Sequence, residues 1–368
     1  MDKISLQRVN GVIFFLFATI AALYIGSAFF IPLVAGIFIA TLVGPLCQAL
    51  ESKGVGRLLS SLLVTLFVFF ATLGIGILLV VQLRQLIDDL PQLERELESF
   101  LRRVQAYVFS QTGFSPEQQR QFILNRSDQI LAQLESVIQK VLGNIFTTTL
   151  HFLLLMVYLF LFLLKRHKYE TFLLMYLPQS KKEKGKEVIA KTTHVAHQYL
   201  WGRIQVMTLL AIMYLITFWI FDLRHMGLLT LFGALVTVIP FVGPFVSGIV
   251  PVAMFIIAGE SISIVLLFAF VVLIVQLIES YIFEPIIMGA EVHLAPITII
   301  IAIILGNMIW GIPGMILFVP IFAIVKIVSD QLEALKPVGW LIGKPEKGPG
   351  GSIRKMILVF VQNVKRRK

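Results

Sequence analysis

The sequence predicts an all-α, polytopic membrane protein with about eight transmembrane helices, broken or re-entrant segments among them, and an extracytoplasmic helical insert. Hydrophobic residues make up 58% of the 368 residues and charged residues only 14%, whereas a soluble domain has roughly 45–50% and about 25%. A helix needs ~20 apolar residues to cross a bilayer. Seven stretches, together more than half of the chain, contain no Asp, Glu, Lys or Arg: 9–50, 58–83, 141–164, 204–221, 226–259, 261–278 and 294–325.

The net charge of +10 comes from basic residues whose placement favours membrane orientation over nucleic-acid binding. They cluster in 165–203 and 326–368, directly beside apolar stretches, as in the cytoplasmic loops of membrane proteins. We therefore expect the lipid bilayer as a partner, no nucleic acid, and both termini in the cytoplasm. The single cysteine, Cys47, excludes a disulfide within the chain.

Residues 1–83 are predicted to form the first three transmembrane helices. Segment 9–50 is too long for one crossing and carries Pro32 and Gly36 near its middle. We expect two helices there, at about 10–30 and about 33–50, joined by a tight turn. The third span follows at 58–83.

Residues 84–142 differ in kind, because seven basic and eight acidic residues nearly balance there. Apolar residues recur every three or four positions from Leu83 to Val104, which indicates an amphipathic helix that runs straight on from the third span. Ser115 and Pro116 supply the start of a second helix after Gly113. We expect an extracytoplasmic amphipathic helical insert, whose apolar stripes pack on each other or on a neighbouring subunit.

Residues 143–328 are predicted to form the transmembrane transport core, with 165–203 as a basic cytoplasmic loop. Two of its apolar segments, 226–259 and 294–327, are long enough either to cross once or to bend back, and both possibilities stay open. Residues 329–368 are expected to form a cytoplasmic tail, basic and amphipathic, that lies on the anionic inner leaflet.

Two proline- and glycine-rich interruptions break the helical pattern in the second half of the chain. The first, 239–251, holds Pro240, Gly243 and Pro251, and the second, 305–320, includes Asn307. Non-helical backbone at membrane depth is tolerated where it is buried in protein or lines a wet cavity. A pair of interrupted hydrophobic segments is the sequence pattern of a transport site. An alternative is that both breaks serve packing alone.

Between the breaks, Gln276 and Glu279 lie near one face of a predicted helix. An acidic side chain inside hydrocarbon costs at least ~2.5–3.5 kcal/mol, so Glu279 should face a cavity or a partner. It is a candidate for binding a cation or exchanging a proton. Alternatively, Glu279 marks the point where the helix leaves the membrane.

The sequence contains no complete Walker A loop, no His-Glu-x-x-His and no Gly-x-Ser-x-Gly motif. We therefore expect neither an ATP-driven pump nor an enzyme, and we expect no cofactor and no metal. A passive or ion-coupled path across the membrane remains.

The broken segments and the polar stretch between them resemble the autoinducer-2 exporter family, and the similarity covers nearly the whole chain. The resemblance implies a multi-pass protein of the bacterial inner membrane that forms a homo-oligomer, with the pentamer as the expected assembly. It also implies export of the quorum-sensing signal autoinducer-2 or, in some members, exchange of sodium or lithium for protons. The positions that match the family signature are Pro240, Gly243, Pro251, Gln276, Glu279, Pro285 and Gly289.

These observations lead us to expect a secondary transporter or facilitator that exports a small polar solute. The two breaks would line its path, with Gln276 or Asn307 holding the solute and Glu279 coupling it to a cation or proton. Two alternatives stay open: a sodium (or lithium)/proton antiporter that uses Glu279, and a non-transporting membrane scaffold.

Overall fold

The computed structural model describes residues 6–112, 136, 139, 143, 145–288 and 294–344, and these are helical except for turns and one isolated bridge. The prediction of an all-α polytopic membrane protein is confirmed. Three shorter apolar helices cover 226–236, 242–257 and 296–310. The described helices that are long and apolar enough to cross a membrane are Ser27–Ser52, Arg57–Asp88, Thr149–Met175, Gln179–Ile220, Ile262–Met288 and Ile312–Gln331.

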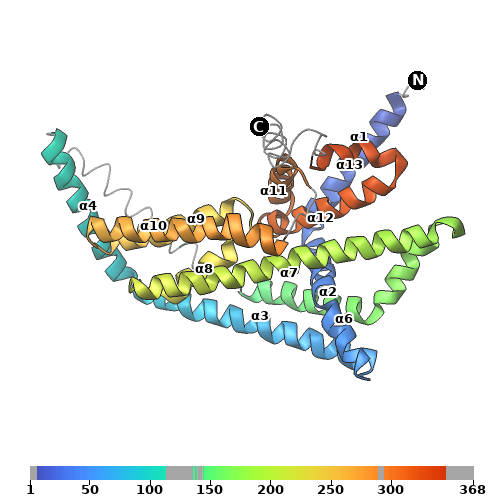
Figure 1. The fold of residues 1–368 in the computed structure, drawn as a ribbon, viewed down its shortest axis with the longest axis horizontal. Coiled ribbons are helices and arrows are strands. Elements are labelled where there is room, and N and C mark those ends of the chain that lie inside the picture. Colours follow the sequence, from blue (N-terminus) through green and yellow to red (C-terminus); the bar gives the residue numbers. More distant parts are fainter. Residues whose placement is uncertain are drawn as a thin grey trace, which may run out of the picture.

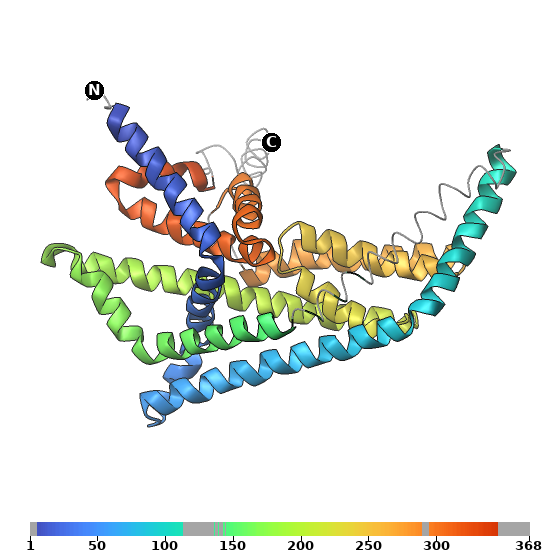
Figure 2. The same cartoon turned by 180° about the vertical axis from the view of Figure 1, so that it is seen from behind.

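Helices α1 (Leu6–Ile25) and α2 (Ser27–Ser52) follow one another as a single bent rod (Figures 1 and 2). The expected tight turn near Pro32 is wrong, because that proline lies inside α2 and the only interruption is at Gly26. Main-chain hydrogen bonds continue across this joint, since the N–H of Phe30 donates to the Gly26 carbonyl at 2.9 Å. One missing N–H at Pro32 therefore does not reverse the chain.

Helix α3 (Arg57–Asp88) is followed at Asp89 by α4 (Leu90–Thr112). The expectation of one straight helix is wrong, because α4 turns sharply away from the line of α3 (Figure 2). Pro91 is the second residue of α4, in the first turn, where the missing N–H of a proline costs no helical hydrogen bond. The rest of the predicted insert, from 113 to 135, lies outside the described residues.

The basic segment 165–203 is mostly helical rather than a loop. Helix α6 (Ile145–Met175) runs through a kink at Lys165, and after the short helix η1 (Gln179–Lys181) the chain returns as α7 (Lys182–Ile220). Basic residues at the ends of two long helices thus produce the charge pattern that predicted a loop. The tail beyond Lys344, for which an amphipathic helix is expected, lies outside the described residues.

Segment 226–259 folds into two short helices, α8 (Met226–Val236) and α9 (Val242–Ile257), which pack on each other. At 11 and 16 residues, both are shorter than a full bilayer crossing, which takes ~20 residues. Helix α10 (Ile262–Ile278) continues directly into η2 (Glu279–Met288). The first break thus forms a joint between two helices that pack together.

The second break also separates two helices that pack on each other, α11 (Pro296–Trp310) and α12 (Ile312–Gln331). They meet at Gly311, whose φ of +63° lies in the left-handed region that glycine adopts without strain. The short helices η3 (Glu333–Leu335) and α13 (Lys336–Ile342) follow.

Three large buried apolar clusters, and a smaller one between α3 and α8, hold these helices together. One joins α7, α8, α9 and α10, the second joins α2, α7, α11 and α12, and the third joins α2, α3 and α6. Helices α3, α7 and α10 run along the long axis of the molecule in both views, while α2 runs across that direction (Figures 1 and 2). Helix α7 contributes to two of the three large clusters, so it is the central element around which the candidate site is built.

Candidate solute and ion site

The helix that carries Glu279 changes type at that residue. Helix α10 ends at Ile278, and the next ten residues form the π-helix η2, with Pro285 inside it. π-Helical turns are rare and are found frequently at functional sites, because they re-aim side chains relative to an α-helix. The polar stretch identified in the sequence therefore coincides with an irregular backbone.

Gln276, one turn before η2, ties three helices together. Its side-chain Nε2 donates to the Ser247 hydroxyl on α9 at 2.8 Å and to the Tyr214 hydroxyl on α7. Tyr214 in turn donates to Ser247 Oγ at 3.2 Å, and Ser247 donates to the main-chain carbonyl of Pro244 at 3.2 Å. The Oε1 of Gln276 is buried without a hydrogen-bond partner among the described residues. This Gln276 network connects the first break to α10.

Glu279 is fully buried and faces Arg203 on α7. Arg203 Nη1 lies 3.9 Å from Glu279 Oε1 and 2.9 Å from Glu284 Oε1. The Ser280 hydroxyl donates to the other oxygen of Glu279 at 3.1 Å. Within the described part of the chain, Glu279 Oε1 and the Nε and Nη2 of Arg203 have no hydrogen-bond partner. Buried charged groups with unmet hydrogen bonds are costly, so these atoms require an explanation, and a functional role is one.

The first break has a strained backbone at Phe241. Its φ of +65° is unusual for a bulky residue, and the N–H of Val242 donates to the Pro240 carbonyl at 2.8 Å. Together they form a γ-turn with positive φ at its centre, the rare and strained form of that turn. Gly243 follows, and a β-carbon there would overlap the main chain of Val236 and Thr237. Only glycine allows α9 to start this close to the end of α8.

The remaining predicted site residues are more dispersed. Pro251 is buried in α9, whereas Pro285 is exposed on η2. Asn307 is also exposed, and its helix α11 packs on α1, α2 and α12 rather than on the helices of the Gln276 network. Gly289 lies outside the described residues. The structure thus brings Gln276 close to the first break and places Asn307 apart from it.

Sequence reasoning missed Arg203, Tyr214 and Ser247. Arg203 was assigned to a cytoplasmic loop, but it lies in α7 with 4% of its surface exposed. The sequence signal that could have identified Arg203 is its position as the last charged residue before the apolar stretch 204–221. It also lies three turns from Tyr214 on the same helix. A single sequence gives no indication that these residues face Glu279 and Gln276.

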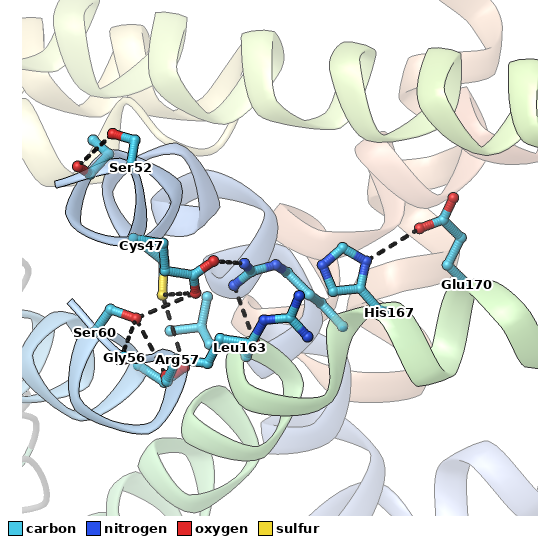
Figure 3. Close-up of polar contacts among 12 residues, drawn as sticks. Cys47, Ser52, Gly56, Arg57, Ser60, Leu163, His167 and Glu170 are labelled. Carbon is cyan, nitrogen blue, oxygen red and sulfur yellow. Dashed lines mark hydrogen bonds and ion pairs between the residues drawn. The ribbon is translucent and has the colours of Figure 1, made fainter. Parts of the chain in front are cut away.

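A second polar cluster, also missed, joins α2, α3 and α6 (Figure 3). Arg166 forms an ion pair with Glu51, and its Nη1 also donates to the Leu163 carbonyl at 3.3 Å. Ser60 donates to the Glu51 carboxylate at 3.2 Å, and the thiol of Cys47 lies 3.9 Å from it. Because Ser60 comes from α3 and Arg166 from α6, while Glu51 lies on α2, this cluster fastens the ends of three helices together.

The described residues hold no group of three or more His, Cys, Asp or Glu placed to bind one ion. Two surface hollows, of about 400 and about 240 Å³, lie between α2 and α3 and between α7 and α12. Neither is lined by Gln276 or Glu279. The candidate site is therefore a buried set of polar contacts between helices.

Comparison with known proteins assigns the chain to a family. The model of the AI-2E family transporters matches residues 13–334, which include every helix of the candidate site. The chain belongs to the AI-2E transporter family. It is 30% identical to the "Putative transport protein YrrI" of Bacillus subtilis (strain 168), over 81% of this chain and 85% of that protein.

Other AI-2E relatives are similar over the same extent. The chain is 26% identical to the "Putative transport protein YueF" of Bacillus subtilis (strain 168), over 82% of this chain and 84% of that protein. It is 28% identical to the "Putative transport protein BpOF4_00890" of Alkalihalophilus pseudofirmus, over 80% of this chain and 81% of that protein. Membership in this family and the apolar helices make the chain a multi-pass membrane protein of a transporter type.

Proposed function

We propose that this protein is a secondary transporter or facilitator that exports a small polar solute, with autoinducer-2 as the first solute to test. The observation that supports it best is Glu279, a fully buried carboxylate at the start of a π-helix, one turn beyond the Gln276 network. Intramembrane acidic side chains that face a partner inside the protein mark substrate and ion paths. The protein acts without enzymatic chemistry in this proposal.

The solute path in this proposal follows the joint between α8 and α9. The Gln276 amide and the Ser247 hydroxyl supply donors and acceptors there, and the Pro244 carbonyl already accepts from Ser247. A polar solute would exchange these contacts for its own. Pro240, Gly243, Pro251, Pro285 and Gly289 would shape the path, while Asn307 is assigned to the separate α11–α12 unit.

The proposed setting is the bacterial inner membrane, with both termini in the cytoplasm and the chain assembled as a homo-oligomer, the pentamer being the expected form. Basic residues at the joined ends of α6 and α7 agree with a cytoplasmic position for that end. In this orientation the end of α3 that leads into α4 lies on the extracytoplasmic side.

A sodium (or lithium)/proton antiporter is the second candidate, because the buried Glu279 could itself be the exchanging group. Reconstituted vesicles preloaded with autoinducer-2 separate the two functions. Solute efflux that is lost in Gln276→Leu and retained in the exposed control Glu260→Gln supports solute transport. Cation flux without solute flux, lost in Glu279→Gln, supports the antiporter. If neither solute nor ion moves, a non-transporting scaffold is the remaining function.

A further inference from the structure

Arg203 stands between two carboxylates of η2, Glu279 and Glu284, which are five residues apart. Its Nη1 is 2.9 Å from Glu284 Oε1 and 3.9 Å from Glu279 Oε1. The two acids differ in surroundings, since the side chain of Glu284 is 42% exposed and that of Glu279 is completely buried. One buried cation is thus shared unequally between an acid that water reaches and an acid that water does not.

The π-helix makes this sharing possible. In an α-helix, two residues five positions apart are rotated by roughly 140° and face different directions. A π-helix, with its i→i+5 hydrogen bonds, turns less per residue, so residue i+5 lies closer to the face of residue i. Glu279 and Glu284 are five positions apart within η2, so both carboxylates can meet the guanidinium of Arg203.

The arrangement leaves hydrogen-bonding capacity unused on both sides of the longer contact. Glu279 Oε1 accepts no hydrogen bond, and Arg203 Nε and Nη2 donate none, within the described part of the chain. An ionised carboxylate buried without a close partner is so unfavourable that the group takes up a proton instead. While Arg203 is engaged by Glu284, Glu279 is therefore the acid that holds a proton.

We propose that Arg203 exchanges its carboxylate partner between Glu284 and Glu279, and that this exchange loads and unloads a proton on Glu279. When Arg203 moves onto Glu279, the O–H bond of the carboxylic acid breaks and the guanidinium replaces its proton. The proton passes to the Glu284 carboxylate that Arg203 has left, and Glu284, which is 42% exposed, releases it to water. The inference rests on the proposed transport function and identifies its coupling ion. Arg203 is a positioning residue in this scheme, because it acts through Glu279.

The same geometry disfavours sodium at Glu279. A hard cation takes several oxygen ligands, whereas among the described residues the hydrogen-bonding oxygens at Glu279 are its own carboxylate and the Ser280 hydroxyl. Glu284 is already bound to Arg203, whose positive charge lies 3.9 Å from the free oxygen of Glu279. A proton needs only that one oxygen.

Carbodiimide labelling tests the exchange without measuring transport. Dicyclohexylcarbodiimide, which dissolves in membranes, reacts with protonated carboxyl groups, and mass spectrometry of the reconstituted full chain reports its adduct at Glu279. In Glu284→Gln, Arg203 loses its nearer partner and moves to Glu279. An opposite charge at this range changes protonation by about tenfold or more, so labelling at Glu279 should fall by about tenfold. The matched control Glu260→Gln removes an exposed carboxylate and should label like the wild type.

Arg203→Gln adds a second arm, in which labelling at Glu279 should equal or exceed that of the wild type. Labelling should also be unchanged by added sodium chloride relative to choline chloride. Wild-type labelling in Glu284→Gln, no labelling of Glu279 in the wild-type protein, or protection by sodium would each overturn the exchange. Solute flux that is absent from wild-type vesicles would overturn the proposed transport function instead, whatever the labelling shows.

Discussion

The carbonyl oxygen of Gly306 on α11 occupies the position that a β-carbon of Gly314 on α12 would need, and the Gly314 carbonyl does the same to Gly306. The two helices therefore meet main chain against main chain. Small residues allow such close approach between membrane helices, where van der Waals packing rather than the hydrophobic effect drives association. The second break in the sequence serves this contact.

We expect Gly314→Ala to separate α11 from α12. Overpacking lowers the free energy of unfolding by ~1–3 kcal/mol where side chains can adjust. We expect a larger loss here, because the new methyl group would meet the main chain of Gly306. Thermal unfolding of the purified protein should shift to lower temperature, and solute flux should be lost with it. Gly74→Ala on α3 is the control, since no atom lies within 4 Å of a β-carbon there. Equal unfolding temperatures for the two variants would contradict the close contact.

Phe241→Gly should stabilise the fold while it slows transport. The positive φ of Phe241 costs about 1–3 kcal/mol, which glycine would not pay, and the Phe241 side chain is 60% exposed and contributes little packing. Because the γ-turn positions α9 against α8, a relaxed turn should weaken the proposed path. Unfolding temperature and flux, measured on the same preparation, should therefore change in opposite directions. Val242→Gly, next to it in α9, should lower the unfolding temperature.

The helical, multi-pass character of the fold was accessible from the sequence because apolar stretches of membrane length carry a strong signal. The places where the chain turns or forms a loop were harder to predict from the sequence. Pro32 predicted a turn, yet the hydrogen bonds across Gly26 keep α1 and α2 in one rod. Basic residues in 165–203 predicted a loop, although charge alone does not distinguish a loop from the solvated end of a long helix.

Part of the candidate site was also accessible. Glu279 and Gln276 are polar residues in an apolar segment, and such residues are conspicuous because they are costly in a membrane. Their partners were not accessible, since Arg203, Tyr214 and Ser247 come from two other helices. Tertiary packing decides which residues meet, and the local pattern of one chain does not contain that information. The π-helix, which brings Glu279 and Glu284 to the same guanidinium, was also not predictable, because the spacing of apolar residues does not reveal it.

The ion pair between Glu51 and Arg166 should contribute measurably to stability, unlike most surface pairs. Their side chains are 18% and 22% exposed, and a hydrogen bond to a charged group at such a site is worth about 1.5–3 kcal/mol. A double-mutant cycle with Glu51→Gln and Arg166→Gln measures the coupling. The matched pair Glu98 and Arg102 on α4 is 45% and 79% exposed, and its cycle should give about 0.5 kcal/mol or less. Similar coupling in the two cycles would contradict the fastening role of Glu51.

His225 should make the folded protein less stable in mild acid. It lies between α7 and α8 with its side chain 5% exposed, and its Nε2 is 3.5 Å from the Asp89 carboxylate. Burial lowers the pKa of His225 below its ordinary value, helped by the charge of Arg224 and opposed by those of Asp89 and Glu96. The unfolded chain therefore binds the proton more readily. Stability is complete above the unfolded pKa of about 6.5 and is lost as the pH falls toward the lower folded value.

The test replaces His225 with a residue that does not titrate but accepts its backbone. His225 has φ of +56° and ψ of +30°, a left-handed conformation that asparagine tolerates. Between about pH 7 and about pH 5 the wild type should lose stability that His225→Asn does not lose. The unfolding temperature of His225→Asn should therefore fall less over this range than that of the wild type. His167→Asn, at an exposed histidine on α6, should keep the wild-type pH profile. Parallel profiles for wild type and His225→Asn would show that burial of this imidazole does not set the acid sensitivity.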